Sequence, residues 1–442
     1  MFSTSDTIVA IATPPGRGGI GIVRVSGSDA RAISAHLTGR DQPLEPRHAT
    51  FVEINGVDHV VVTYFQAPAS YTGEDVVEIS AHGSPVVLNG IVTAALGWGA
   101  RLAEPGEFTL RAYLNGRMDL MQAEAVADLI ESVTPLQARA AFDQLQGTLT
   151  GAIGEIDAAL FDLIARLEAS VDFPEEGYHF ADPSVLAEAV DALVDRTNGL
   201  LASGRRGRLV REGLQVAIVG PPNVGKSSLF NTLAGASRAI VASVPGTTRD
   251  LVTETVDLDG LRVTLIDTAG LRHTSDIVES EGVARARQAA EIADLTLVVA
   301  DRSLPLNEDV QHTLTEMAGR TTVVVANKAD LPGKWSIPDA LDVSATSGLG
   351  LDTLRRRIVA QLGIELVADR PQITNIRHIA LVERARDALV RAKAALEDGR
   401  ALPEEFVLAD LQSARAAFEE ITGRRTPDDV LAHIFERFCI GK

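Results

Sequence analysis

The sequence contains one cysteine, Cys439, among 442 residues. A single thiol excludes an intramolecular disulfide, and it excludes structural zinc sites that are built from several cysteines. The sequence also has no run of eighteen consecutive apolar residues, and no basic N-terminal segment leads into an apolar one, so the usual signals of a membrane span or a secreted protein are missing. We therefore expect a soluble, cytoplasmic protein with no membrane partner.

Positive charge is scarce. The chain has 41 Lys and Arg against 60 Asp and Glu, which gives a formal net charge of −19. A protein that binds phosphate backbones through its own electrostatic field has the opposite balance, so we expect any nucleic acid to bind together with a partner. The length suggests about three domains at about 150 residues each, and the hydrophobic fraction of 45% is sufficient for packed cores.

The most informative stretch is residues 220–227 (GPPNVGKS), which lies between an apolar run at 214–219 and a helical pattern that begins at 228. Glycines let the backbone close around phosphates, while successive N–H groups and the helix N-terminus face the negative charge. Lys226 reaches the β and γ oxygens, and Ser227 offers its hydroxyl to Mg²⁺. The stretch predicts a nucleotide site with contacts from Asn223, Val224, Gly225, Lys226, Ser227 and Ser228.

Further motifs identify the nucleotide as GTP. Residues 267–270 (DTAG) end a second apolar strand, where the aspartate holds Mg²⁺ through water and the glycine N–H senses the γ-phosphate. Residues 327–330 (NKAD) place Asp330 to accept both hydrogens that guanine donates and adenine lacks. Residues 344–346 (SAT) resemble the backbone element that caps the guanine O6. The predicted contacts are Thr247, Thr248 (also to Mg²⁺), Asp267, Thr268, Ala269, Gly270, Asn327, Lys328, Asp330, Ser344, Ala345 and Thr346.

Hydrophobic periodicity divides the chain into four segments. Residues 1–118 combine short β-rich runs with two helical patterns, which predicts an α+β domain. Residues 119–212 and 364–442 have apolar positions at helical spacing and predict one all-α domain in two parts. Residues 213–363 alternate strands and helices, with an Asp-Gly hairpin signal at 259–260, and predict an inserted α/β Ras-like GTPase domain. Its sheet is expected to be doubly wound and mostly parallel, with one antiparallel edge.

Two local signals refine this division. Ser28 is expected to cap the N-terminus of the first helix. Residues 203–208 (SGRRGR) are small, basic and rich in glycine, which predicts a linker into the first GTPase strand. The arginines suit phosphate contacts, but a solvated linker face is the simpler interpretation.

The whole chain resembles the MnmE (TrmE) family of tRNA modification GTPases. Besides the GTPase motifs, the resemblance is carried by residues 14–19 (PPGRGG), 72–75 (TGED), 105–109 (PGEFT), 114–120 (LNGRMDL) and 438–442 (FCIGK). It implies an N-terminal domain that binds 5-formyltetrahydrofolate or 5,10-methylenetetrahydrofolate and forms a constitutive homodimer. It also implies a heterotetramer with MnmG (GidA), an FAD and NADH protein, which installs an aminomethyl or carboxymethylaminomethyl group on C5 of wobble uridines, with tRNA bound mainly through the complex.

The resemblance also implies residues for the folate. Arg24, Glu78, Arg117 and Lys442 match the family's folate contacts, and Cys439 would lie near them. Family members often carry lysine where this chain has Arg117, which keeps the charge but changes the donor geometry. Cys439 is either a reactive thiol beside a cofactor or a structural cysteine. Prenylation does not fit, because Gly441 is not aliphatic and Lys442 is not a usual last residue.

GTP hydrolysis needs a group that positions water, and the Ras-like glutamine is replaced by Leu271. Glu279 matches the family's catalytic glutamate. Asn223 resembles the family's potassium ligand, and K⁺ would supply the positive charge of a missing arginine finger when two G domains meet. A loop would complete the K⁺ shell with backbone carbonyls, chiefly those of Ala242, Val244 and Thr247. The same loop is also expected to contact GTP through Ala242, Ser243, Val244, Pro245, Gly246, Thr247 and Thr248.

Two other functions remain open from the sequence. A ribosome-assembly GTPase of the Era or Der kind carries a basic KH-type module after the G domain, whereas the segment after residue 363 is helical and belongs to an acidic chain. A metabolic folate enzyme that uses GTP only as a regulator is the third possibility. Copurified folate and analysis of modified bases in tRNA discriminate among the three.

Overall fold

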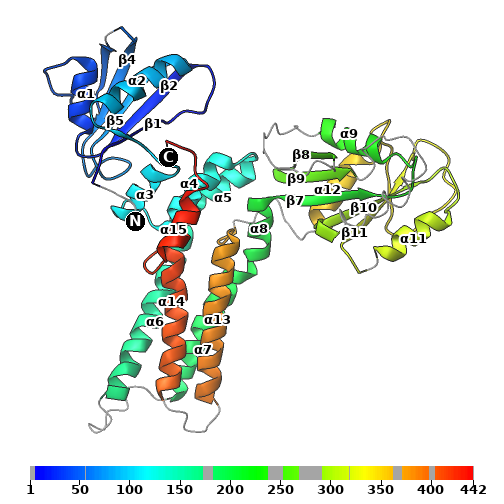
Figure 1. Cartoon of the computed structure of the whole chain (residues 1–442). Coiled ribbons are helices and arrows are strands. Elements are labelled where there is room, and N and C mark those ends of the chain that lie inside the picture. Colours follow the sequence, from blue (N-terminus) through cyan, green and yellow to red (C-terminus); the bar gives the residue numbers. More distant parts are fainter. Residues whose placement is uncertain are drawn as a thin grey trace. The chain divides into compact units, whose positions relative to one another are not determined.

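The computed structural model describes residues 5–54, 56–172, 183–236, 252–267, 291–317, 319–361, 371–397 and 404–441. The chain divides into two compact units (Figure 1). The first unit comprises Met1–Ala127, Gln144–Val190 and Asp387–Lys442, and the second comprises Asp128–Asp143 and Asp191–Arg386. Within the described ranges, no helix has both the length and the apolar composition that crossing a bilayer requires.

The first unit begins with a six-stranded sheet that two helices cover on one face (Figure 1). The strand order is β3-β4-β5-β2-β1-β6, and all neighbours are antiparallel except β1 and β6. Apolar residues at alternate strand positions point toward the helices and form one buried core. The elements are β1 (Ile8–Ile11), β2 (Gly18–Ser26), α1 (Ala30–Thr38), β3 (Ala49–Ile54), β4 (Asp58–Phe65), β5 (Val76–Gly83), α2 (Pro85–Gly97) and β6 (Arg101–Leu102).

The predicted cap of α1 is wrong by one residue. The N-cap is Asp29, and no side chain caps the helix. The entry into the helix is fixed by the backbone, because Gly27 has a φ of 134° and its carbonyl accepts from Ala30 N at 3.2 Å. The hydroxyl of Thr7 in addition accepts from Asp29 N at 3.0 Å. A glycine turn and a neighbouring strand therefore replace the side-chain cap that the sequence suggested.

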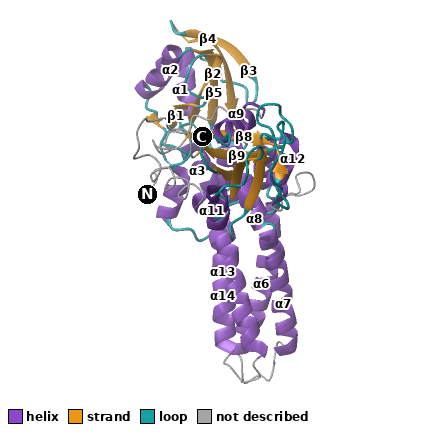
Figure 2. Cartoon of the chain, turned by 90° about the vertical axis from the view of Figure 1, so that its right-hand side faces the viewer, coloured by secondary structure: helices purple, strands orange, loops and turns teal. Residues whose placement is uncertain are grey.

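Helices make up the remainder of the first unit, and Figure 2 shows the longest of them in purple. α6 and α14 pack side by side, joined by an ion pair of 3.2 Å between Arg415 and Asp157. One face of α6 is buried, and it consists of Ile153, Ile156, Leu160, Leu163, Ile164 and Leu167. The elements are α3 (Glu107–Leu114), α6 (Thr148–Asp172), α14 (Glu404–Thr422) and α15 (Asp428–Phe435), while α4 (Leu120–Glu131), α7 (Pro183–Ala202) and α13 (Ile376–Glu397) belong partly to each unit.

The second unit is built on a doubly wound sheet of order β12-β11-β10-β7-β9-β8. All neighbours are parallel except β8 and β9, which meet at Asp259 and Gly260, both with positive φ. The predicted α/β sheet with one antiparallel hairpin is thereby confirmed, and separate cores lie on its two faces. The elements are β7 (Leu214–Val219), α9 (Lys226–Ala236), β8 (Val252–Leu258), β9 (Leu261–Asp267), β10 (Leu295–Asp301), α11 (Glu308–Glu316), β11 (Thr322–Asn327), β12 (Leu341–Asp342) and α12 (Leu351–Gln361).

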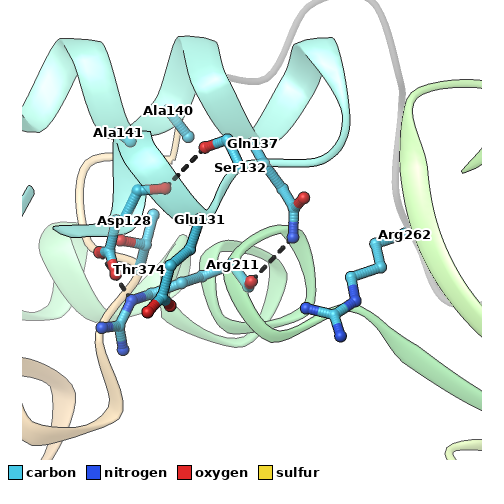
Figure 3. A pocket seen from close by; sticks show the side chains of 9 residues that line it. All are labelled: Asp128, Glu131, Ser132, Gln137, Ala140, Ala141, Arg211, Arg262 and Thr374. Atoms are coloured by element: carbon cyan, nitrogen blue, oxygen red, sulfur yellow. Dashed lines mark hydrogen bonds and ion pairs between the residues drawn. The ribbon is translucent and has the colours of Figure 1, made fainter. Parts of the chain in front are cut away.

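Two more helices extend the core of the second unit. They are α5 (Pro135–Leu145) and α8 (Gly204–Glu212), which contribute Ala140, Leu209 and Val210 to the core that also contains β7 and β9. The predicted linker is therefore wrong, because its residues lie in α8. A small polar pocket lies beside these helices, where Gln137 donates to the carbonyl of Arg211 and Arg211 pairs with Asp128 at 2.7 Å (Figure 3).

Candidate nucleotide-binding site

The phosphate-binding stretch connects β7 to α9, and its glycines occupy positions that no other residue fits. Gly220 has a φ of 146°, and a Cβ there would lie 2.2 Å from the carbonyl oxygen of Val299. Gly225 has a φ of 95°, and a Cβ there would lie 2.3 Å from Nδ2 of Asn327. The backbone therefore curls tightly over the end of β7 and leads into the N-terminus of α9, where free N–H groups favour an anion.

Lys226 places a positive charge inside this loop. Its side chain is buried, and Nζ donates to the carbonyl oxygens of Gly220 at 2.8 Å and Pro221 at 2.7 Å. Burial lowers the pKa of the ammonium group, while the negative charge of Asp267 opposes that shift. Since a desolvated ammonium gains most from an anionic partner, this lysine suits the β and γ oxygens of a nucleotide.

The two described residues that were predicted to serve Mg²⁺, Ser227 directly and Asp267 through water, come from neighbouring elements. Ser227 lies exposed in the first turn of α9, and Asp267 ends β9 with its side chain buried. β9 runs parallel to β7, and Asp267 is in register with Ile218, close to the start of the phosphate loop. A hydroxyl, a carboxylate and phosphate oxygens form the hard donor set that Mg²⁺ prefers. Among the described residues, no group of three or more His, Cys, Asp or Glu is arranged so that it could hold a metal ion.

Asn327 joins three of the predicted motifs. It ends β11, and its buried side chain donates from Nδ2 to the carbonyl oxygen of Val224 at 2.8 Å. Its Oδ1 accepts from Ala345 N at 3.1 Å. Thr232 of α9 adds a hydrogen bond of 2.9 Å to the carbonyl of Ala345. One amide thus fixes the phosphate loop, the guanine motif and the O6-capping motif relative to one another.

The other residues predicted to contact the base follow Asn327 in the chain. Asp330 and Thr346 are exposed, so their side chains are accessible to a ligand. Ser344 is fully buried, and its hydroxyl accepts from Ser347 N at 3.1 Å, which shapes the turn that presents Ala345 and Thr346. The roles of these residues in binding GTP remain predictions.

One residue of this site was missed by the sequence reasoning. Asp301 ends β10 in register with Asn327, and its Oδ2 lies 2.6 Å from Nζ of Lys328. Its signal in the sequence is weak: an acidic residue closes the apolar run at 295–300. Only the pairing of β10 with β11 shows that this acid faces the guanine motif.

Several predicted residues lie outside the described ranges. They are the switch and potassium-loop residues Ala242, Ser243, Val244, Pro245, Gly246, Thr247, Thr248, Thr268, Ala269 and Gly270, the proposed catalytic Glu279, and Lys442. Of the residues named for GTP, the structure therefore places those from the phosphate loop, Asp267, and the two base motifs.

The first unit brings together the residues named for folate. Arg24 and Glu78 are register partners on β2 and β5, and their side chains form an ion pair of 2.8 Å. The guanidinium of Arg24 also donates to the carbonyl oxygen of Gly441 at 3.1 Å. It lies 5.3 Å from the ring centroid of Tyr71 and 5.6 Å from that of Phe108, a stacked and partly buried arrangement.

Arg117 and Cys439 lie on the loops around this cluster. A Cβ at Gly73, whose φ is 81°, would lie 3.3 Å from Cγ of Arg117, so the alkyl part of the exposed arginine lies over the TGED segment. The backbone carbonyl of Cys439 accepts from Gly106 N at 3.5 Å, and its thiol is exposed. The cluster offers cationic, anionic and aromatic groups, which suit a ligand that carries both a carboxylate tail and a heteroaromatic ring.

Comparison with known proteins identifies the family. The model of the MnmE helical domain matches residues 120–439, and that of the GTP-binding protein TrmE N-terminus matches residues 7–117. The chain belongs to the MnmE family. The tRNA modification GTPase MnmE of Nitrosomonas eutropha is 43% identical over 455 residues, and that of Koribacter versatilis is 46% identical over 462 residues. Each match covers 100% of both chains.

Membership in the MnmE family confirms the resemblance drawn from the sequence and assigns the chain to the GTPases. Among solved structures, the G domain of the T. maritima FeoB iron transporter is 28% identical, over 34% of this chain and 98% of that chain, with a TM-score of 0.25. The family matches extend over the N-terminal and helical segments. They favour tRNA modification over the ribosome-assembly alternative.

Proposed function

We propose that this protein is the GTP-hydrolysing component of a system that modifies C5 of wobble uridines in tRNA. The observation that carries the GTP-hydrolysing part of the proposal is the position of Asn327, whose one side chain ties the phosphate loop to both base-recognition motifs. Full-length similarity to proteins named tRNA modification GTPase MnmE supports the choice of pathway. GTP is the substrate, and Mg²⁺ would be held by Ser227 and Thr248, with Asp267 acting through water.

The first unit would bind a one-carbon tetrahydrofolate. The ion pair of Arg24 with Glu78 and its stacking on Tyr71 and Phe108 support this assignment, because they pre-organise a cation beside aromatic rings. When bound, the folate supplies the one-carbon group. The four segments proposed from the sequence then have separate roles: residues 1–118 bind folate and form the homodimer, 213–363 bind GTP, and 119–212 with 364–442 form the helical domain that connects them.

The partners follow from the same proposal. The redox chemistry of the modification requires a flavin and a nicotinamide, which MnmG would supply in a heterotetramer. Since the chain carries a net charge of −19, tRNA is proposed to bind mainly through that complex, in the cytoplasm.

The deciding experiment is mass analysis of wobble uridines in tRNA from cells that lack this protein. We expect C5-substituted uridines to disappear and to return when the parent chain is expressed. Unchanged C5 substitution in the deletion strain would reject the function, whatever the rate of GTP hydrolysis. A deletion strain with normal uridines but defective ribosomal subunits would support the ribosome-assembly alternative instead.

A further inference from the structure

The loop that carries the guanine-recognition residue is anchored to the end of β10. Lys328 forms an ion pair of 2.6 Å with Oδ2 of Asp301, and Trp335 donates from Nε1 to the carbonyl oxygen of Asp301 at 2.9 Å. Lys334 N donates to the carbonyl oxygen of Arg302 at 2.9 Å. The loop that includes Asp330 is therefore fixed at its beginning and at its end by two consecutive residues, Asp301 and Arg302.

Lys328 also reaches the phosphate loop. Its Nζ donates to the carbonyl oxygen of Asn223 at 3.2 Å. Both Asn223 and Lys328 have a φ of 62°, in the left-handed region that residues other than glycine rarely adopt. Such conformations persist only where surrounding contacts hold them, and they concentrate at ligand sites. The hydrogen bond thus joins two residues in this conformation, one in the phosphate loop and one in the guanine motif.

The two oxygens of Asp301 have separate partners. Oδ1 accepts from the N–H of Ser303 at 2.9 Å and from its hydroxyl at 2.6 Å, whereas Oδ2 accepts from Lys328. The side chain is only 7% exposed. Burial alone would raise the pKa of Asp301, but the hydrogen bonds from Lys328 and Ser303 hold it below its usual value. A buried carboxylate that keeps its charge forms a strong, directional anchor for a lysine.

We propose that Asp301 is a positioning residue for guanine nucleotide binding, which acts by holding Lys328 between the base loop and the phosphate loop. This inference rests on the proposed function, in which Lys328 and Asp330 belong to the guanine site. A free lysine side chain populates many rotamers, and ordering it on binding costs free energy. Because Asp301 restrains Lys328 before the nucleotide arrives, binding does not have to order it.

A double-mutant cycle in the full-length chain tests the proposal. Asp301→Asn keeps the oxygen that faces Ser303 and replaces the oxygen that faces Lys328 with an NH₂ group, which donates hydrogen bonds. Lys328→Met keeps an unbranched side chain but removes its charge. We expect each change to weaken GDP binding by roughly tenfold, mainly through faster dissociation. Because both changes remove the same link, the double variant should bind GDP within about twofold of Lys328→Met. Titration calorimetry measures the affinities.

The control is Asp294→Asn, directly before the first residue of β10. Asp294 accepts from Gln215 N at 2.9 Å, and the length of β10 separates it from Asp301, so this variant should bind GDP like the parent. A second variant, Asp301→Glu, keeps the carboxylate and moves it by one carbon. Thermal unfolding of each nucleotide-free variant shows that it is folded, and Asp301→Glu with Lys328→Met completes the cycle if Asp301→Asn is not folded.

The results distinguish a failure of the guanine site from a failure of the positioning role of Asp301. Parent protein that binds ADP as well as GDP rejects the guanine site and with it the proposed function. Parent protein that prefers GDP, combined with an Asp301→Asn variant of unchanged affinity, overturns only the positioning role. Effects of Asp301 and Lys328 that multiply in the double variant also overturn it, because a merely structural aspartate would act independently of the lysine.

Discussion

Arg111 is the least exposed charged side chain among the described residues, and it shows how one buried cation organises its surroundings. It pairs with Asp6 at 2.7 Å, with Glu107 at 2.9 Å and with Glu74 at 3.2 Å. These carboxylates come from the N-terminal segment, from α3 and from the TGED segment. A buried charge is tolerated only when opposite charges compensate it, so the arginine fixes all three segments at once. The glycine-rich motifs of this region therefore have a structural role beside their proposed part in binding.

Replacing Asp6 by Asn should weaken the first unit in a pH-dependent manner. The hydrogen bond from Arg101 is the largest influence on the pKa of Asp6. Burial acts in the opposite direction, but a further hydrogen bond from Arg111 adds to the first, and together they lower the pKa from 3.8 to about 2. Because the folded pKa lies below the unfolded one, the stabilisation is complete above about pH 4 and is lost as the pH falls toward 2. Since a third of the side chain is exposed, we expect a loss of only about 1 to 2 kcal/mol at pH 7.

Urea denaturation measured through Trp98 checks this expectation. The chain has two tryptophans, and Trp335→Phe leaves Trp98 of the first unit as the reporter. Between pH 4 and 2 the free energy of unfolding of Asp6→Asn should fall less steeply than that of the parent. Identical slopes would show that Asp6 does not contribute its charge to folding.

At the scale of helices and strands, α8 is an element that local sequence patterns do not predict. Residues 204–212 are basic and contain two glycines, a composition typical of a linker. In the structure the glycine face of α8 packs against Pro371, Ile373 and Ile379, and a Cβ at Gly207 would lie 1.9 Å from the carbonyl oxygen of Ile373. The helix forms because a distant segment covers it, and no local pattern encodes that contact.

Other elements were predictable because their signal is local. Buried positions alternate with less buried ones along β4 and most of β5, and Asp259-Gly260 defines a hairpin, so the positions of these strands followed from periodicity and turn chemistry. The same holds for the phosphate loop, whose glycines sit where the backbone crowds Val299 and Asn327. Asp301 could not be predicted as part of the site, because its partner is set by the register between β10 and β11.

Gly207→Ala tests the packing of α8. The added methyl group would meet backbone, which cannot move aside as a flexible side chain does, so we expect a destabilisation of about 2 kcal/mol or more. The matched control is Gly199→Ala in α7, where a Cβ meets nothing within 4 Å. This second change should stabilise the helix by about 0.5 to 1 kcal/mol, because alanine is the better helix former. Thermal unfolding of both variants measures the difference, and equal effects would contradict the packing argument.

At the scale of the whole chain, two ends that are far apart in sequence meet in the first unit. Arg24 donates to Gly441, 417 positions away, and a Cβ at Gly441 would lie 2.4 Å from the carbonyl oxygen of Ile11. A Cβ at Gly106 would likewise lie 2.6 Å from the carbonyl of Phe435. Close backbone contacts explain why glycine is needed in the PGEFT and FCIGK motifs. Periodicity gave no indication of this contact, which the family resemblance alone implied.

The proposed potassium site involves two chains, because it forms when two G domains meet. Asn223 holds its backbone in the left-handed region and exposes its side chain, while Lys328 binds its carbonyl oxygen. We propose that this side chain binds K⁺ when two G domains meet, and that Glu279, outside the described residues, positions the attacking water. Because two chains of net charge −19 repel each other, a cation between them favours their association as well as the reaction.

Steady-state GTP hydrolysis in KCl and in NaCl at equal ionic strength checks this mechanism. We expect the parent rate to be at least about tenfold higher in KCl and to rise with protein concentration, and Asn223→Ala to lose the stimulation. Glu279→Ala should lower turnover by about 10²-fold and leave GTP affinity within about twofold, since the carboxylate acts mainly on the transition state. Equal parent rates in the two salts would reject the potassium site. Normal turnover in Glu279→Ala would assign the positioning of water to another residue, because a group that stabilises only the transition state cannot be removed without slowing the reaction.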